Sequence, residues 1–172
     1  MKINKGSKAF LFKKESFNCG LVDLEEILKN PDINKIVIIF SRYFGCPICM
    51  LDFINLIKIK DIIKQKKDYL IYITQSSKEV AEEIIKKYDI DFPIIGSSKE
   101  ELYANYGLGK LSLSSIAVIP KKLIEAKKLG FEHGKTEGYE AQSPGQFVID
   151  KNGVIIHMKK GWLDINSIIS SL

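Results

Sequence analysis

Two stretches of the chain consist almost entirely of apolar, mostly β-branched residues, and a segment of helical periodicity follows each of them. Lys35–Ser41 and Asp68–Thr74 carry the unbroken apolar run that is typical of strands buried on both faces of a parallel sheet. Residues 50–67 and 76–88 then place apolar side chains at helical spacing. This alternation predicts a βαβα unit whose parallel strands are joined by a right-handed crossover.

The C-terminal part of the chain predicts a hairpin followed by a short helix. Residues 146–150 and 154–160 have the composition of two strands, and a tight turn separates them. We expect the Asn152-Gly153 pair to supply the left-handed backbone of that turn. Asp164 precedes a helical pattern and is predicted to cap the last helix.

The remaining segments are less regular. Apolar alternation in residues 9–17 predicts an N-terminal hairpin, and residues 21–30 have helical spacing. The stretch 91–143 holds a short apolar run, two helical patterns over 97–107 and 120–130 and a polar loop, and we interpret it as an insertion before the C-terminal hairpin. No repeat or linker divides the sequence, so we expect one α/β domain over residues 1–172.

Composition and charge exclude several classes of protein. The chain has 172 residues, of which 45% are hydrophobic and 27% charged, as in an ordinary globular domain. The net charge of +5 comes from scattered lysines without arginine forks or an aromatic platform, so we expect no nucleic-acid partner. No apolar run approaches the roughly 18 residues that span a bilayer, so we expect no membrane partner. The first residues lack the pattern of an export signal, and we therefore expect a cytoplasmic, reducing environment.

The sequence Cys46-Pro47-Ile48-Cys49 stands where a buried strand gives way to a helix. The free N–H groups and the positive dipole end of that helix favour a thiolate at Cys46. In such settings the pKa of a thiol falls from about 8.5 to between about 3.5 and 7.5. Pro47 fits the first helical position, where it costs no hydrogen bond. Cys49 lies one turn on, so the two sulfurs are expected to form a disulfide reversibly.

Arg42 is the single arginine of the chain and lies four residues before Cys46. A guanidinium fixed near the sulfur would stabilise the thiolate and orient an oxygen of a peroxide or a carboxylate. The alternative is an arginine that forms a salt bridge at the edge of the sheet. Because lysine occupies every other basic position, we favour the functional interpretation.

Alternatives to redox chemistry stay open at this point. A structural zinc site would need two further ligands, for which the remaining candidates are Cys19, His133 and His157, and these do not form a second ligand pair. In a further alternative, the two cysteines are buried and chemically inactive, and the protein is a binding or interaction module without enzymatic activity. Cys19 is expected to be a small apolar filler rather than a third redox partner, and both histidines are expected to have structural roles.

Together these segments resemble the thioredoxin fold, and more narrowly the alkyl hydroperoxide reductase and thiol-specific antioxidant (AhpC/TSA) proteins. The resemblance rests on IVIIFSRYFGCPICMLDF, FPIIGSSKEELYANYGL, PGQFVIDKNGVI and the Gly-Trp-Leu-Asp ending. It implies a three-layer α/β/α fold of peroxiredoxin type with a mixed central sheet. It also implies a cis bond between Ser143 and Pro144 that faces the cysteines.

The resemblance implies a thiol-disulfide oxidoreductase or thiol peroxidase without metal or organic cofactor. Cys46 and Cys49 form the reactive pair with Arg42 beside them, and the flanking residues expected to bind substrate are Tyr43, Phe44, Pro47, Ser143 and Pro144. The substrate would be a hydroperoxide or a disulfide, and the reductant a thiol of the thioredoxin or glutathione type. Monomer and homodimer are both compatible with the sequence.

The motif also departs from the family pattern. Peroxiredoxins usually have a proline seven positions before the peroxide-reacting cysteine and a residue with a hydroxyl group three positions before it. Before Cys46, these two positions hold Ile39 and Tyr43. Before Cys49 the same positions hold Arg42 and Cys46. Disulfide exchange is therefore a firmer expectation than peroxide reduction, and the sequence does not decide which cysteine meets a peroxide first.

Overall fold

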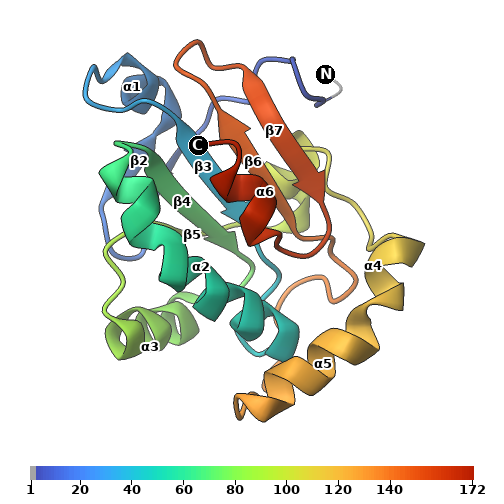
Figure 1. The fold of residues 1–172 in the computed structure, drawn as a ribbon. Helices are drawn as coiled ribbons and strands as arrows, with labels where there is room; N and C mark the ends of the chain where they lie inside the picture. The colour runs from blue at the N-terminus through green and yellow to red at the C-terminus, as the bar shows by residue number, and fades with distance from the viewer. Residues whose placement is uncertain (1–2) are drawn as a thin grey trace.

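The computed structural model describes residues 3–172 and is built around a five-stranded mixed sheet (Figure 1). The strand order is β5-β4-β3-β6-β7. Strand β3 runs parallel to β4 and antiparallel to β6, while β5 is parallel to β4 and β7 antiparallel to β6. The strands are β3 (Ile36–Phe40), β4 (Tyr69–Thr74), β5 (Ile94–Gly96), β6 (Gly145–Ile149) and β7 (Ile155–Lys160).

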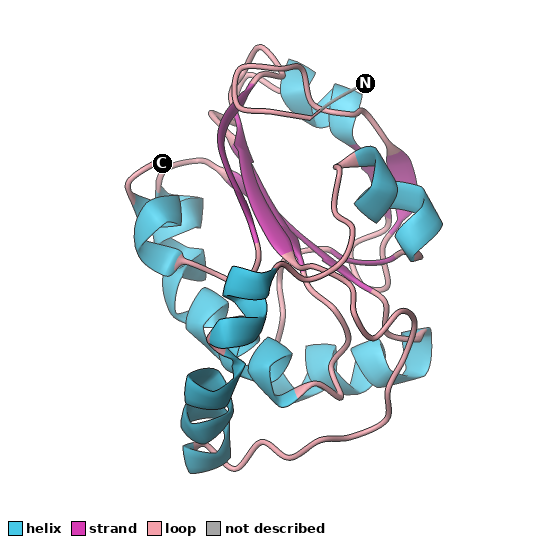
Figure 2. Cartoon of the chain, turned by 90° about the vertical axis from the view of Figure 1, so that its right-hand side faces the viewer, coloured by secondary structure: helices cyan, strands magenta, loops and turns pink. Residues whose placement is uncertain are grey.

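Helices and loops cover both faces of this sheet, which confirms the three-layer architecture (Figures 1 and 2). One face packs against α2 (Pro47–Gln65), α3 (Lys78–Tyr88) and α6 (Ile165–Ile169). The other face packs against the N-terminal segments and the region around η1 (Lys99–Tyr103), a short helical segment that is kinked at Glu101. The N-terminal segments are β1 (Lys13–Glu15), β2 (Leu21–Asp23) and α1 (Leu24–Lys29).

An N-terminal hairpin is present, because β1 and β2 pair in antiparallel fashion, but only β1 lies within residues 9–17, from which the hairpin was predicted. The predicted helix over residues 21–30 begins later, since its first three residues form β2. In the insertion, the pattern over 97–107 yields η1 rather than a regular helix. The second pattern belongs to α5 (Ile119–Lys128), which starts before Pro120 because proline fits the first turn of a helix, and α4 (Leu113–Ala117) precedes it.

The turn between β6 and β7 differs from the expected one. Gly153 has a positive φ of 73°, whereas Asn152 does not adopt left-handed backbone. The carboxylate of Asp150 instead accepts the N–H groups of Asn152 and Val154, both at 2.9 Å. A side-chain acceptor thus organises this turn. Asp164 caps α6 as predicted by accepting the N–H of Ser167 at 3.2 Å.

The register between β3 and β6 assembles two distant parts of the chain. Phe40, the last residue of β3, lies opposite Gly145, the first residue of β6. The segment that leaves β3 toward the cysteines therefore meets the segment that carries Pro144 into β6. Within residues 3–172, no helix is both long enough and apolar enough to cross a membrane.

Candidate active site

Cys46 is the N-cap residue of α2, and Pro47 occupies the first helical position. The Sγ atom of Cys46 accepts the backbone N–H of Cys49 at 3.3 Å. The N–H of Cys46 itself donates to the carbonyl of Tyr43 at 3.1 Å, which closes the turn between β3 and α2. Both cysteines thus lie on the first turn of the helix, as the sequence predicted, and both are free thiols.

Arg42 lies beside the sulfur of Cys46. Its Nη1 is 3.7 Å from Cys46 Sγ, and its guanidinium carbon lies 5.3 Å and 5.7 Å from the ring centres of Tyr43 and Trp162. The other terminal nitrogen donates to the carbonyl of Glu140, while the buried Nε has no partner among the described residues. No acidic side chain forms a salt bridge with Arg42 in this part of the chain, so the interpretation as a salt bridge at the sheet edge is wrong.

These contacts separate the acidities of the two thiols. Hydrogen bonding from Cys49, the positive charge of Arg42 and the N–H groups of the first helical turn lower the pKa of Cys46 to about 7, although burial opposes the shift. Burial and the neighbouring Cys46 sulfur raise the pKa of Cys49 well above its ordinary value. The arrangement therefore favours a thiolate at Cys46 and a protonated thiol at Cys49.

Both cysteines are less accessible than the start of a helix suggested. Cys46 is 3% exposed and Cys49 2% exposed. They pack in a small apolar cluster with Trp162, and Ile119 and Leu123 of α5 contact that cluster from the insertion. The indole N–H of Trp162 donates to the carbonyl of Ser115 at 2.9 Å, which ties this ring to α4.

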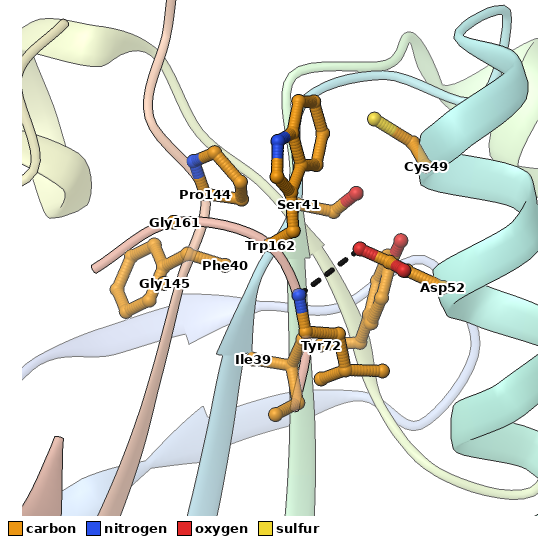
Figure 3. A pocket seen from close by; sticks show the side chains of 11 residues that line it. Ile39, Phe40, Ser41, Cys49, Asp52, Tyr72, Pro144, Gly145, Gly161 and Trp162 are labelled. Atoms are coloured by element: carbon orange, nitrogen blue, oxygen red, sulfur yellow. Dashed lines mark hydrogen bonds between the residues drawn. The ribbon is translucent and has the colours of Figure 1, made fainter. Parts of the chain in front are cut away.

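A cavity of about 10 Å³ lies beside Cys49 (Figure 3). Cys49 and Asp52 project into it from α2, and Trp162 and Pro144 form part of the opposite side. A volume of this size accommodates about one water molecule. Pro144 therefore lies near the cysteine pair, as the resemblance implied.

The peptide bond between Ser143 and Pro144 is trans, and no cis bond occurs in residues 3–172, so the expectation of a cis proline is wrong. The backbone is fixed here by other means. The carbonyl of Pro144 accepts the N–H of Gly161 at 2.8 Å, and the N–H of Ser143 donates to the carbonyl of Gly109 at 2.8 Å. The hydroxyl of Ser143 donates to the carbonyl of Pro144 at 3.0 Å. The hydrogen bonds of Ser143 thus fix the backbone of the loop that leads into β6.

The two aromatic residues before Cys46 lie in different surroundings. The ring of Phe44 belongs to the main core, where its centroid is 5.2 Å from that of Phe53 and 5.7 Å from that of Tyr72. Tyr43 is buried in the cysteine cluster, and its hydroxyl lies 3.3 Å from Nε2 of His133. The structure therefore brings Tyr43, but not the ring of Phe44, to the cysteines.

Asp52 is a largely buried acid that the sequence pattern did not single out. Its carboxylate pairs with Lys122 of α5 at 2.7 Å. It also accepts the N–H of Leu163 at 3.0 Å, which Figure 3 marks with a dashed line. Burial raises its pKa, although the pairing with Lys122 opposes that shift. Its position three residues after Cys49, on an otherwise apolar side of α2, was the available signal.

The other singled-out residues lie elsewhere or have ordinary roles. Cys19 is exposed and lines a cavity with Asp68 and Tyr69 at the start of β4, whereas Cys46 follows the end of the parallel strand β3. The expectation of a buried apolar filler is therefore wrong. His157 lies 3.0 Å from the amide nitrogen of Gln146. In the described part of the chain, no three Cys, His, Asp or Glu side chains are arranged to hold a metal ion.

Comparison with known proteins decides the family. The sequence profile of the AhpC/TSA family matches residues 6–158. This chain belongs to the AhpC/TSA family. A search among curated protein sequences finds no significant match. Membership in the AhpC/TSA family supports a thiol-dependent redox function, which agrees with the position and acidity of Cys46.

Solved structures share the fold of this AhpC/TSA protein at low identity. Peroxidoxin BcpB from Mycobacterium tuberculosis is 12% identical with a TM-score of 0.70, over 97% of this chain and 94% of that one. The reduced 2-Cys peroxiredoxin of Plasmodium vivax is 16% identical with a TM-score of 0.68, over 96% of this chain and 78% of that one. A thiol:disulfide interchange protein of the thioredoxin family from Chlorobium tepidum is 14% identical with a TM-score of 0.60, over 98% of this chain and 95% of that one.

Proposed function

We propose that the protein is a thiol-dependent oxidoreductase in which Cys46 attacks a hydroperoxide or a disulfide and Cys49 resolves the product. The observation that carries this proposal is the asymmetry of the pair. Arg42 and the N–H of Cys49 contact the sulfur of Cys46, whose pKa is lowered to about 7, while the pKa of Cys49 is raised. The thiolate is the attacking form in both reactions, so Cys46 is the nucleophile.

With a hydroperoxide, the thiolate of Cys46 forms a bond to one peroxide oxygen and the O–O bond breaks. The leaving alkoxide takes a proton and departs as an alcohol, and Cys46 becomes a sulfenic acid. The thiol of Cys49 then attacks that sulfur, water leaves and the disulfide forms. The two thiols have supplied the two electrons that reduced the peroxide.

With a disulfide, the thiolate of Cys46 displaces one thiolate and forms a mixed disulfide. Cys49 displaces the second thiol and closes the same intramolecular disulfide. In both cycles two external thiols restore the dithiol and are themselves oxidised to a disulfide. A reducing compartment such as the cytoplasm would supply these thiols, and neither cycle uses a metal or an organic cofactor.

Arg42 is the group best placed to act on the substrate. Its buried Nε–H has no partner, while Nη1 contacts the sulfur of Cys46. The unpaired donor would bind an oxygen of a hydroperoxide beside the attacking sulfur and stabilise the charge on the leaving oxygen. The hydroxyl of Tyr43 contacts His133 instead, so Arg42 supplies the donor that the absent hydroxyl residue provides in peroxiredoxins.

The test is a count of thiols after one equivalent of hydrogen peroxide. The reduced chain has three free cysteines, and we expect the loss of Cys46 and Cys49 with Cys19 unchanged. Cys46→Ser abolishes turnover with an external thiol, and Cys49→Ser accumulates a sulfenic acid at Cys46 that dimedone labels. Cys19→Ser is the matched control and retains full activity. Turnover that survives in Cys46→Ser contradicts the proposal.

A further inference from the structure

We propose that residues 131–140, here named the strap, determine the substrate class of the reactive pair. The strap admits low-molecular-weight hydroperoxides, disulfides and thiols to Cys46 and excludes disulfides held in folded proteins. This inference rests on the proposed function of Cys46. It adds a specificity-determining element that lies outside the motif itself.

The strap lies directly on the turn that carries Cys46. The N–H of Gly134 donates to the carbonyl of Gly45 at 2.8 Å. A Cβ atom at Gly45 would lie 2.2 Å from the carbonyl oxygen of Lys135, so the two backbones touch without room for a side chain. His133 adds its contact with the hydroxyl of Tyr43 at 3.3 Å. The residue immediately before the nucleophile is therefore covered by backbone.

Beyond this crossing, the strap is anchored at the start of α3 and at the end of β4. The carboxylate of Glu137 accepts the N–H of Ser77 at 3.0 Å, and Glu137 is buried although most of the strap is exposed. Gln75 and the backbone of Tyr139 exchange two hydrogen bonds, of 2.9 Å and 3.2 Å. These contacts fix the strap at a point away from the sulfurs, so variants made here remove no atom that contacts Cys46 or Cys49.

The strap, held over the turn that carries Cys46, discriminates between substrates by their size. To react, a substrate sulfur or oxygen must come within about 3.5 Å of the Cys46 sulfur and in line with the bond that breaks. A disulfide in a folded protein also brings its flanking backbone to this place. Ile119 of α5 packs there on the cysteine cluster, and the strap crosses the neighbouring Gly45. A hydroperoxide brings two oxygens at its reacting end. Local opening of an exposed segment suffices for the small molecule, whereas the protein requires release of the Glu137 anchor.

Two variants loosen the strap by different means. Glu137→Ala removes the anchor at Ser77. Gly138→Ala introduces a Cβ that would lie 2.7 Å from the side chain of Gln75, at a positive φ of 70°. Glu132→Ala is the matched control, because it removes an exposed carboxylate from the same segment. None of these residues contacts Cys46 or Cys49.

The experiment compares kcat/KM for hydroxyethyl disulfide and for insulin disulfides, with dithiothreitol as electron donor. We expect the unmodified protein to favour the small disulfide by more than about 100-fold. Both loosened variants should raise kcat/KM for insulin at least about tenfold while the small disulfide changes less than about threefold. Equal efficiency on both substrates in the unmodified protein, or loosened variants that behave like Glu132→Ala, would overturn the inference.

A second measurement separates failure of this inference from failure of the proposed function. Alkylation of Cys46 is followed by mass spectrometry with iodoacetamide and with the bulky fluorescein maleimide, and the exposed Cys19 serves as an internal standard. Loosening should accelerate the bulky reagent about tenfold at Cys46 and leave Cys19 unchanged. If neither disulfide nor hydrogen peroxide is reduced but this acceleration is seen, the proposed function is wrong although the strap does shield Cys46. If both disulfides are reduced but loosening the strap does not accelerate the bulky reagent at Cys46, the inference on the strap is wrong.

Discussion

Nη1 of Arg42 lies 3.7 Å from Sγ of Cys46, and the same guanidinium donates to the carbonyl of Glu140. One side chain thus connects the reactive sulfur to the end of the strap. This second contact holds the buried positive charge in place, so its effect on the thiol does not depend on a mobile surface group. The acidity of Cys46 and the position of the insertion are coupled through this residue.

The pH dependence of alkylation tests the acidity of the thiols. Because the pKa of Cys46 is lowered to about 7, its reaction with iodoacetamide should rise with pH to half its maximal rate near pH 7. The pKa of Cys19 is raised by partial burial and by Asp91, so its profile should reach half its maximal rate at a higher pH than that of an ordinary thiol. Peptide-level mass spectrometry measures both profiles in one sample. Coincident profiles would contradict the assignment of Cys46 as the thiolate.

Substitution of Arg42 tests the cause of that acidity. Arg42→Met removes the positive charge beside the sulfur, so the midpoint for Cys46 should move up by about one pH unit. Arg42→Lys keeps a positive charge but loses the planar guanidinium group. The midpoint for Cys46 in this variant should lie between those of the unmodified protein and of Arg42→Met. The comparison uses the same alkylation assay, with Cys19 as the reference. A midpoint that stays near pH 7 in Arg42→Met would show that Cys49 and the N–H groups of the helix set the acidity without Arg42.

The ion pair between Asp52 and Lys122 links α2 to the insertion, and its removal should be costly. Asp52→Ala leaves the Lys122 ammonium without its partner and should lower the free energy of unfolding by about 3 kcal/mol. Lys122→Met leaves a carboxyl whose pKa is raised by burial above its unfolded value. Such a group loses stabilisation as pH rises, so this variant should be more destabilised at pH 8 than at pH 4.5. Urea unfolding at both pH values measures the difference.

Gly45→Ala tests the contact between the strap and the reactive turn. The new Cβ would lie 2.2 Å from the carbonyl oxygen of Lys135, and backbone on both sides cannot yield as a side chain would. We expect a loss of about 2 kcal/mol in the free energy of unfolding, together with faster labelling of Cys46 by bulky reagents. Gly109→Ala is a suitable control, because no atom lies within 4 Å of its added Cβ. Equal effects of both substitutions would argue against the close contact.

The sequence pattern predicted much of the fold for a physical reason. The strands Ile36–Phe40 and Tyr69–Thr74 are buried on both faces, and this burial imposes the unbroken apolar run that predicts a central parallel strand. The helix after Cys46 carries apolar residues at helical spacing because one side of it packs on the sheet. A regular helix was predicted over residues 97–107, but the chain kinks at Glu101, and helical spacing in a sequence does not indicate such a kink.

The site was only partly predictable for a different reason. Cys46, Cys49 and Arg42 lie within eight positions, so local spacing alone indicates their proximity. Trp162 and Glu140 reach the same place through the pairing of β3 with β6 and through the path of the strap. Such long-range contacts follow from tertiary packing, and the polar sequence of the strap resembles any solvated loop.

The opposition of Phe40 and Gly145 has a consequence for the chain during its synthesis. Residue 140, whose carbonyl holds Arg42, is synthesised long after Cys46 and just before β6. A chain made only as far as α5 lacks this contact, so we expect the thiol of Cys46 to reach its full acidity only once the last strands have joined the sheet. The nascent protein would then be less open to premature oxidation by the compounds that it is proposed to consume.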